Sequence, residues 1–199
     1  MGILAQTAPS TILGILGCFA AGAVAVPLPL PMRAVDPEAF IEQTVLRLDK
    51  VGAKLAVLPG ELISMGGDMG ERVRLLAAEE LPADGDLPPL ASGREDIAIV
   101  QFTSGSTSEP RGVVLTHGNV NANSRAIEAT VGVHPEDTVV SWLPLYHDMG
   151  LIGFLITALN CGTSLVIMPP QRFTADPSLW LQAISDHKAT LTGGPNFGF

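Results

Sequence analysis

The chain has 199 residues, of which 47% are hydrophobic and only 16% are charged. This composition indicates a buried globular interior and argues against a disordered tail. The net charge of −9 repels a phosphate backbone, and no cluster of Lys and Arg offsets it, so we expect no nucleic-acid partner. Cys18 and Cys161 can pair in principle, but two cysteines make no disulfide framework, and a reducing, cytoplasmic location is the simpler expectation.

An uncharged apolar run, ILGILGCFAAGAVAV, covers residues 12–26. It is shorter than the ~20 residues that a helix needs to cross a bilayer. A signal peptide carries positive charge ahead of its apolar part, whereas the first basic residue here is Arg33. We therefore expect no membrane span, and instead a buried helix that leads into a buried strand.

Capping residues, turn residues and hydrophobic periodicity predict the remaining elements. The first helix has Ser10 or Thr11 as its cap, and two later helices start with Asp-Pro, at Asp36 and Asp176. Residues 79–95 are rich in Pro, Gly and acids, which predicts a surface connection and a subdomain seam at 79–96. In chain order, we expect helices over 12–21, 37–51, 70–78, 117–130, 149–159 and 177–187, and strands over 24–26, 54–58, 97–102, 113–115, 138–141, 163–168 and 189–192.

The alternation of apolar strands with helices predicts the fold class. Continuous apolar strands are typical of parallel sheets that are covered on both faces. We expect an α/β fold with α/β/α layers and a mostly parallel sheet. In such folds, ligands bind in loops that leave the carboxyl ends of strands. Three loops are predicted at such ends, after residues 97–102, 138–141 and 189–192.

The first loop is rich in small hydroxyl residues and ends in Pro110-Arg111-Gly112. Backbone N–H groups in such a turn form an anion-binding concavity, and hydroxyls add donors without adding charge. Arg111 can make a charge-assisted contact to phosphate. A phosphate site and an ordinary solvated turn both remain open at this point. The hydroxyl-rich run consists of Thr103, Ser104, Gly105, Ser106, Thr107 and Ser108.

The second and third loops offer polar and glycine residues for a ligand. In the second, residues 142–150, His147 can orient a carboxylate or phosphoryl oxygen, and Asp148 can cap the helix that follows; the alternative assigns the aromatic residues to the core and Asp148 to capping alone. In the third, Gly193 and Gly194 allow a ligand to approach the backbone, although a plain turn explains them equally well. We find no His, Cys and acid spacing of a metal site and no nucleophile elbow. The other histidines, His117, His134 and His187, lie at helix ends, where surface or capping roles are expected.

Together the motifs resemble those of a known family. Residues 102–119, FTSGSTSEPRGVVLTHGN, resemble the phosphate-binding signature of the adenylate-forming enzymes, which include acyl-CoA synthetases, luciferases and peptide-synthetase adenylation domains. The segments SWLPLYHDMGLIG and GGPNF resemble one branch, the fatty acyl-AMP ligases, and so does GCFAAGAVAVPLPLP. Ser108 stands where many members have Gly, and Arg111 where many have Lys. The resemblance covers nearly the whole chain, with its motifs in the family's order.

The resemblance implies a reaction and roles for residues. Residues Thr103 to Ser108 would wrap the β- and γ-phosphates of ATP with Arg111, and Thr107 would help hold Mg²⁺. His147 would lie near the fatty carboxylate that attacks the α-phosphorus, giving acyl-AMP and pyrophosphate. His147 and Arg111 would thus be the catalytic residues. The residues implied for the acyl or adenylate pocket are Met149, Gly150, Gly193, Gly194, Pro195, Asn196 and Phe197.

The resemblance also implies an incomplete N-terminal subdomain, because family members are several hundred residues long. We find no adenine-binding segment, ribose-binding motif or C-terminal lid domain with its lysine in residues 1–199. Three hypotheses therefore remain: part of a fatty-acid-activating enzyme that feeds lipid or polyketide assembly, a non-catalytic nucleotide-binding relative, and an interaction protein completed by another chain. A fragment of an acyl-CoA synthetase or peptide-synthetase domain is a further alternative. An acyl carrier protein or coenzyme A would accept the acyl group.

Overall fold

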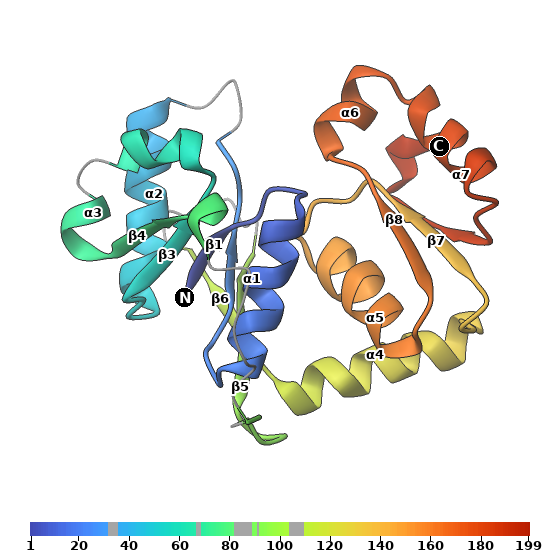
Figure 1. Cartoon of the computed structure of the whole chain (residues 1–199), viewed down its shortest axis with the longest axis horizontal. Helices are drawn as coiled ribbons and strands as arrows, with labels where there is room; N and C mark the ends of the chain where they lie inside the picture. Colours follow the sequence, from blue (N-terminus) through green and yellow to red (C-terminus); the bar gives the residue numbers. More distant parts are fainter. Residues whose placement is uncertain (32–35, 67–68, 82–88, 91, 104–109) are drawn as a thin grey trace. The chain divides into compact units, whose positions relative to one another are not determined.

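The computed structural model describes residues 1–31, 36–66, 69–81, 89–90, 92–103 and 110–199. These residues form two compact units, Met1–Gly118 and Asn119–Phe199, and each unit combines strands with helices (Figure 1). Much of the predicted seam at 79–96 lies outside the described residues, so that boundary stays a prediction.

Unit 1 is built on parallel strands in the order β2-β1-β3-β4. Strands β5 and β6 pair with each other in antiparallel fashion. The Ala25 N–H donates to the Ala98 carbonyl, and the Val100 N–H donates to the Ala25 carbonyl. These two hydrogen bonds place β5 beside the chain that enters β2. The elements are β1 (Gly2–Leu4), α1 (Pro9–Ala20), β2 (Val26–Leu28), α2 (Pro37–Lys50), β3 (Leu55–Leu58), η1 (Gly60–Gly66), α3 (Met69–Arg72), β4 (Arg74–Ala77), η2 (Ala78–Glu80), β5 (Ile97–Phe102) and β6 (Gly112–Thr116).

The two large helices of unit 1 cover opposite faces of the sheet. A Cβ at Gly2 would meet Leu48 of α2 at 2.5 Å, whereas Ile3 lies beside Gly14 of α1. Consecutive residues of a strand point to opposite faces, so α1 and α2 must lie on either side of β1. This is the predicted α/β/α layering, and the core on the α2 side includes Leu4, Leu28, Leu48, Ala56 and Leu58.

Unit 2 has a three-stranded parallel sheet in the order β8-β7-β9. Both Val139 and Val140 of β7 are buried, which requires cover on both faces of the strand; Figure 1 shows α5 and α7 on opposite sides of it. The elements are α4 (His117–Val131, which starts in unit 1), β7 (Thr138–Ser141), the π-helix η3 (Met149–Ile156), α5 (Thr157–Cys161), β8 (Ser164–Ile167), α6 (Pro170–Ala175), α7 (Ser178–Asp186), β9 (Leu191–Thr192) and η4 (Asn196–Gly198).

The predicted fold class is confirmed, and most predicted elements are present within a few residues. Both Asp-Pro signals lie at helix starts: Asp36 precedes α2, and Asp176 accepts hydrogen bonds from the backbone and side chain of Ser178 at the start of α7. Among the helices of the described residues, none combines the length and the apolar character that crossing a bilayer requires. Cys18 and Cys161 are both free thiols.

Three local predictions are wrong. The helix expected at 70–78 is the short helix α3 followed by β4, because Arg74–Ala77 pairs in parallel with β3. The strand expected to stop at Pro27 includes it. The Val26 N–H donates to the Met1 carbonyl and the Leu28 carbonyl accepts the Ala5 N–H, so the pairing around β1 needs no proline N–H. The first helix starts at Pro9, so Ser10 and Thr11 lie inside it and do not cap it.

We expect Leu48→Ala to destabilise unit 1 by about 2 to 5 kcal/mol, because Leu48 is fully buried in α2 and its removal leaves a cavity. Leu46→Ala is the matched control, since Leu46 lies on the same helix and is 42% exposed. Urea unfolding of the two variants measures the difference. Equal losses of unfolding free energy would contradict the assigned core.

We expect unit 2 to lose stability on acidification through Asp137. Its carboxylate accepts hydrogen bonds from the Thr190 hydroxyl and the His134 N–H, both at 2.7 Å, and these bonds lower its pKa. A carboxyl with a lower pKa in the folded state stabilises the fold above its unfolded pKa, and that contribution is lost as the pH falls through the folded pKa. Thermal melts from pH 6 to 3 should therefore show a shallower pH dependence for Thr190→Val than for the natural sequence.

Candidate functional site

The first predicted loop joins β5 to β6 as a hairpin. The Thr103 N–H donates to the Arg111 carbonyl at 3.0 Å, and Phe102 pairs with Gly112 at the end of the ladder. The two ends of the loop are thereby held side by side. Of the predicted cradle, only Thr103 is among the described residues; Ser104, Gly105, Ser106, Thr107 and Ser108 lie outside them.

The end of this hairpin depends on a glycine and presents a cation. A Cβ at Gly112 would lie 2.9 Å from Val100 Cγ1 and 3.3 Å from Phe102, so a larger residue would push the strands apart. Arg111 is exposed and makes no ion pair with any residue that the structure describes. An exposed guanidinium can make charge-assisted hydrogen bonds to an anion.

The second predicted loop follows β7 and places His147 next to Asp148. His147 Nδ1 lies 2.6 Å from Asp148 Oδ1, and both side chains are exposed. The same carboxylate oxygen accepts the Met149 N–H at 2.7 Å, so Asp148 caps η3 as predicted. Because Nδ1 contacts the Asp148 carboxylate, Nε2 is the ring nitrogen that can bind a ligand.

The helix after this loop has π-type hydrogen bonding, which the sequence did not indicate. Its first residues are Met149 and Gly150, both implied for the pocket. A Cβ at Gly150 would fall against the Pro144 carbonyl oxygen and lie 3.0 Å from the Pro144 carbonyl carbon, so only glycine fits. The π-form is rare and often occurs at functional sites. Glycine thus lets the helix start close beneath the preceding loop.

The third predicted loop packs against aromatic residues of unit 2. A Cβ at Gly193 would lie 3.2 Å from Phe154, and one at Gly194 would lie 3.2 Å from Trp142. These glycines therefore allow close approach to aromatic rings of the same chain. Pro195 accepts the Gly198 N–H, while Asn196 and Phe197 are exposed. The structure brings the second and third loops together through Trp142.

Trp142 is buried in the core, as the alternative for the second loop expects, whereas Tyr146 is half-buried. Trp142 is 4% exposed and packs with Phe173 and Trp180. Burial raises the pKa of the Tyr146 phenol, so the hydroxyl stays protonated at neutral pH. Only His147 and Asp148 of this loop's polar residues are well exposed. The aromatic residues therefore support the loop, and the polar pair faces solvent.

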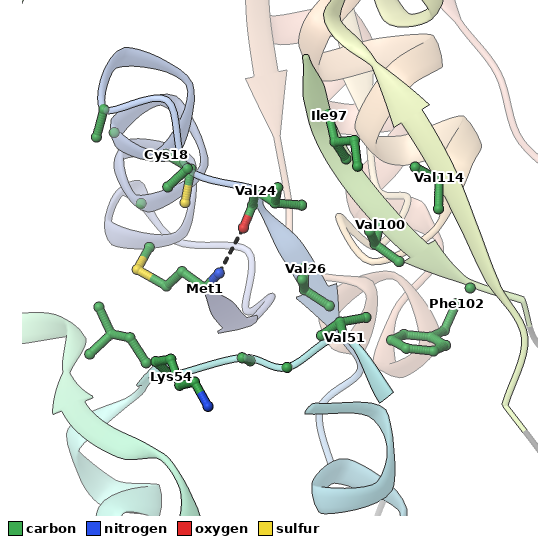
Figure 2. A pocket seen from close by; sticks show the side chains of 18 of the residues that line it. Met1, Cys18, Val24, Val26, Val51, Lys54, Ile97, Val100, Phe102 and Val114 are labelled. Carbon is green, nitrogen blue, oxygen red and sulfur yellow. Dashed lines mark hydrogen bonds between the residues drawn. The ribbon is translucent and has the colours of Figure 1, made fainter. Parts of the chain in front are cut away.

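Unit 1 contains two further features that sequence reasoning missed. The His117 ring is half-buried and packs edge-on against Phe19 at 5.3 Å, which corrects the surface role expected for it. An apolar cavity of about 1150 Å³ lies among α1, α2, the amino ends of the strands and the β5–β6 hairpin (Figure 2). Burial raises the pKa of the Cys18 thiol in its wall, which favours the protonated thiol over the thiolate. The cavity lining includes none of the predicted site residues.

Comparison with known proteins gives matches along the whole chain. The family model described as AMP-binding enzyme matches residues 1–197. A long-chain-fatty-acid–AMP ligase of Mycobacterium marinum is 34% identical over 213 residues, which cover 100% of this chain and 36% of that protein.

Solved structures match the fold equally well. One structure, from work on the fatty acyl-adenylate ligases of E. coli and L. pneumophila, has a TM-score of 0.90 and 34% identity, and covers 99% of this chain and 37% of that chain. A fatty acyl-adenylate ligase of L. pneumophila in complex with acyl adenylate and pyrophosphate has a TM-score of 0.86 and 31% identity, with coverage of 99% and 35%. The chain spans about a third of the length of these proteins. With residues 1–197 matched by the family model, the chain belongs to the AMP-binding enzyme family.

Proposed function

We propose that this chain provides the phosphate-binding and acid-binding parts of a fatty acyl-AMP ligase. In this reaction an oxygen of the fatty carboxylate forms a bond to the α-phosphorus of ATP. The bond from that phosphorus to the bridging oxygen breaks, and its electron pair leaves with pyrophosphate. Acyl-AMP is the second product. The observation that carries the proposal is the family match over residues 1–197, together with relatives that are named fatty-acid–AMP and fatty acyl-adenylate ligases.

The β5–β6 hairpin is suited to the phosphate end of ATP. The bond between the Thr103 N–H and the Arg111 carbonyl closes a short loop at the carboxyl end of β5. In the proposal, residues Thr103 to Ser108 donate hydroxyl and backbone hydrogens to the β- and γ-phosphates, and Arg111 balances their charge. Thr107 is the proposed protein ligand of Mg²⁺, which when bound neutralises phosphate charge.

The loop after β7 is suited to the carboxylate. Asp148 lies 2.6 Å from His147 Nδ1 and so orients the ring, and with both ring nitrogens protonated the Nε2–H would donate to an oxygen of the acid or of the α-phosphate. Fixed donors of this kind need no reorganisation as charge moves to the leaving group. Met149, Gly150 and residues Gly193 to Phe197 are proposed to line the acyl or adenylate pocket. Acyl carrier protein or coenzyme A is the proposed acceptor.

A nucleotide-binding relative without turnover is the second candidate. Such a protein binds ATP through the same hairpin but forms no acyl-AMP. A measurement of turnover separates the two candidates.

Exchange of radioactive pyrophosphate into ATP, dependent on a fatty acid, tests the proposed reaction. We expect exchange by a ligase that contains this chain and a loss of at least about tenfold in Thr107→Val and Arg111→Gln, because each removes a contact to the phosphates or their metal. Arg74→Gln is the matched control, since Arg74 is an exposed arginine on β4 of the same unit. Binding of ATP by that ligase without any exchange would favour the second candidate.

Replacement of His147 tests the acid-binding half. We expect His147→Ala to lower acyl-AMP formation about 10- to 100-fold, because a fixed donor to the reacting oxygens is removed. His187→Ala is the control, since His187 is an exposed residue at the end of α7. Acyl-AMP is quantified by trapping with hydroxylamine. Equal activities of the two variants would contradict the role of His147.

A further inference from the structure

Trp142 is the central ring of an aromatic cluster in unit 2. The ring is 4% exposed and stacks on Phe173 with centroids 3.8 Å apart and planes at 8°. Trp180 and Phe197 each approach it edge-on at 6.0 Å. Three neighbouring rings therefore fix the position of the indole.

The loop after β9 lies directly on this indole. A Cβ at Gly194 would stand 3.2 Å from Cζ2 and 3.5 Å from Nε1 of Trp142, and a Cβ at Gly198 would stand 3.0 Å from Cζ2. A side chain at either position would lift the loop from the ring.

The Trp142 N–H is a buried donor, and no residue that the structure describes accepts it. Its neighbour differs, because the Trp180 Nε1–H donates to the Thr192 hydroxyl at 2.9 Å. A buried donor without an acceptor is unfavourable, so an oxygen atom that reaches it is stabilised. Phosphoryl and carboxyl oxygens accept more strongly than neutral groups.

We propose that Trp142 binds the acyl-adenylate: its ring supports the Gly193–Gly198 loop, and its N–H donates to a carboxyl or phosphoryl oxygen of the ligand beside Gly194. The inference rests on the proposed function, because that function supplies the oxygen-rich ligand. It adds a residue that the motifs did not indicate. It also makes the close approach of Gly194 to the indole part of the proposed ligand contact.

The two indole N–H groups can be followed separately, since the chain has only two tryptophans. In ¹H–¹⁵N spectra of the full chain, Trp142→Phe and Trp180→Phe assign the two indole signals. Before ligand is added, we expect the Trp180 proton downfield, as in a hydrogen bond, and the Trp142 proton upfield. A non-hydrolysable acyl-sulfamoyl adenosine should move the Trp142 proton downfield and slow its exchange, and leave the Trp180 proton in place. Fatty acid alone and AMP alone distinguish the carboxyl from the phosphoryl oxygen.

Calorimetry with the same analogue separates the possible failures. Binding with an unmoved Trp142 signal would overturn this inference and leave the proposed function intact. A Trp142 proton that is already downfield and slow to exchange before addition would overturn it as well, because the donor would then have another partner. No binding of the analogue to the folded chain would contradict the proposed function and this inference together.

Two variants give the size of the effect. Trp142→Phe keeps an aromatic ring but no N–H, and Gly194→Ala places a methyl group 3.2 Å from Trp142 Cζ2, which displaces the loop from the indole; we expect each to weaken analogue binding about tenfold. Gly17→Ala is the control for a glycine substitution, because a Cβ there meets nothing within 4 Å. If Trp142→Phe does not fold, the titration of the natural chain alone decides, with Trp180→Phe for assignment.

Discussion

Burial of β1 on both faces is the constraint on which unit 1 depends. Gly2 admits Leu48 on one side, and Ile3 meets Gly14 on the other, so a three-residue strand carries contacts to both α1 and α2. Strands β2 and β3 pair with β1 on its two edges. The attachment of β5 beside the chain entering β2 then follows, and with it the position of the hairpin that holds the predicted phosphate-binding motif.

Close approaches at glycines position the candidate site in the same way. Gly112 lets β6 pack onto Val100, Gly150 lets η3 start beneath Pro144, and Gly194 lets the last loop lie on Trp142. In each case, the absent Cβ fixes where a loop lies relative to a strand end. The glycines of the motifs therefore allow close packing within the chain, whether or not they also contact a ligand.

Features set by neighbouring residues were predictable, and features set by distant pairing were not. The apolar runs predicted β3, β5, β7 and β8, and the adjacency of His147 and Asp148 made their contact foreseeable. The helix predicted over residues 70–78 is wrong because Arg74–Ala77 becomes a strand only through its pairing with Leu55–Leu58. The unpaired N–H of Trp142 depends on a loop that comes much later in the chain, and no local pattern reveals it.

The outer edge of β6 has a consequence for the behaviour of the chain in solution. Among the described strands, β6 pairs with β5 alone, and its Val113 and Val114 are 46% and 54% exposed. An apolar strand with an unpaired edge is a template for pairing with another molecule. The net charge of −9 opposes such contact by repulsion between molecules. Colloidal stability therefore depends on that charge, and it weakens in high salt and near the isoelectric point of about 4.7.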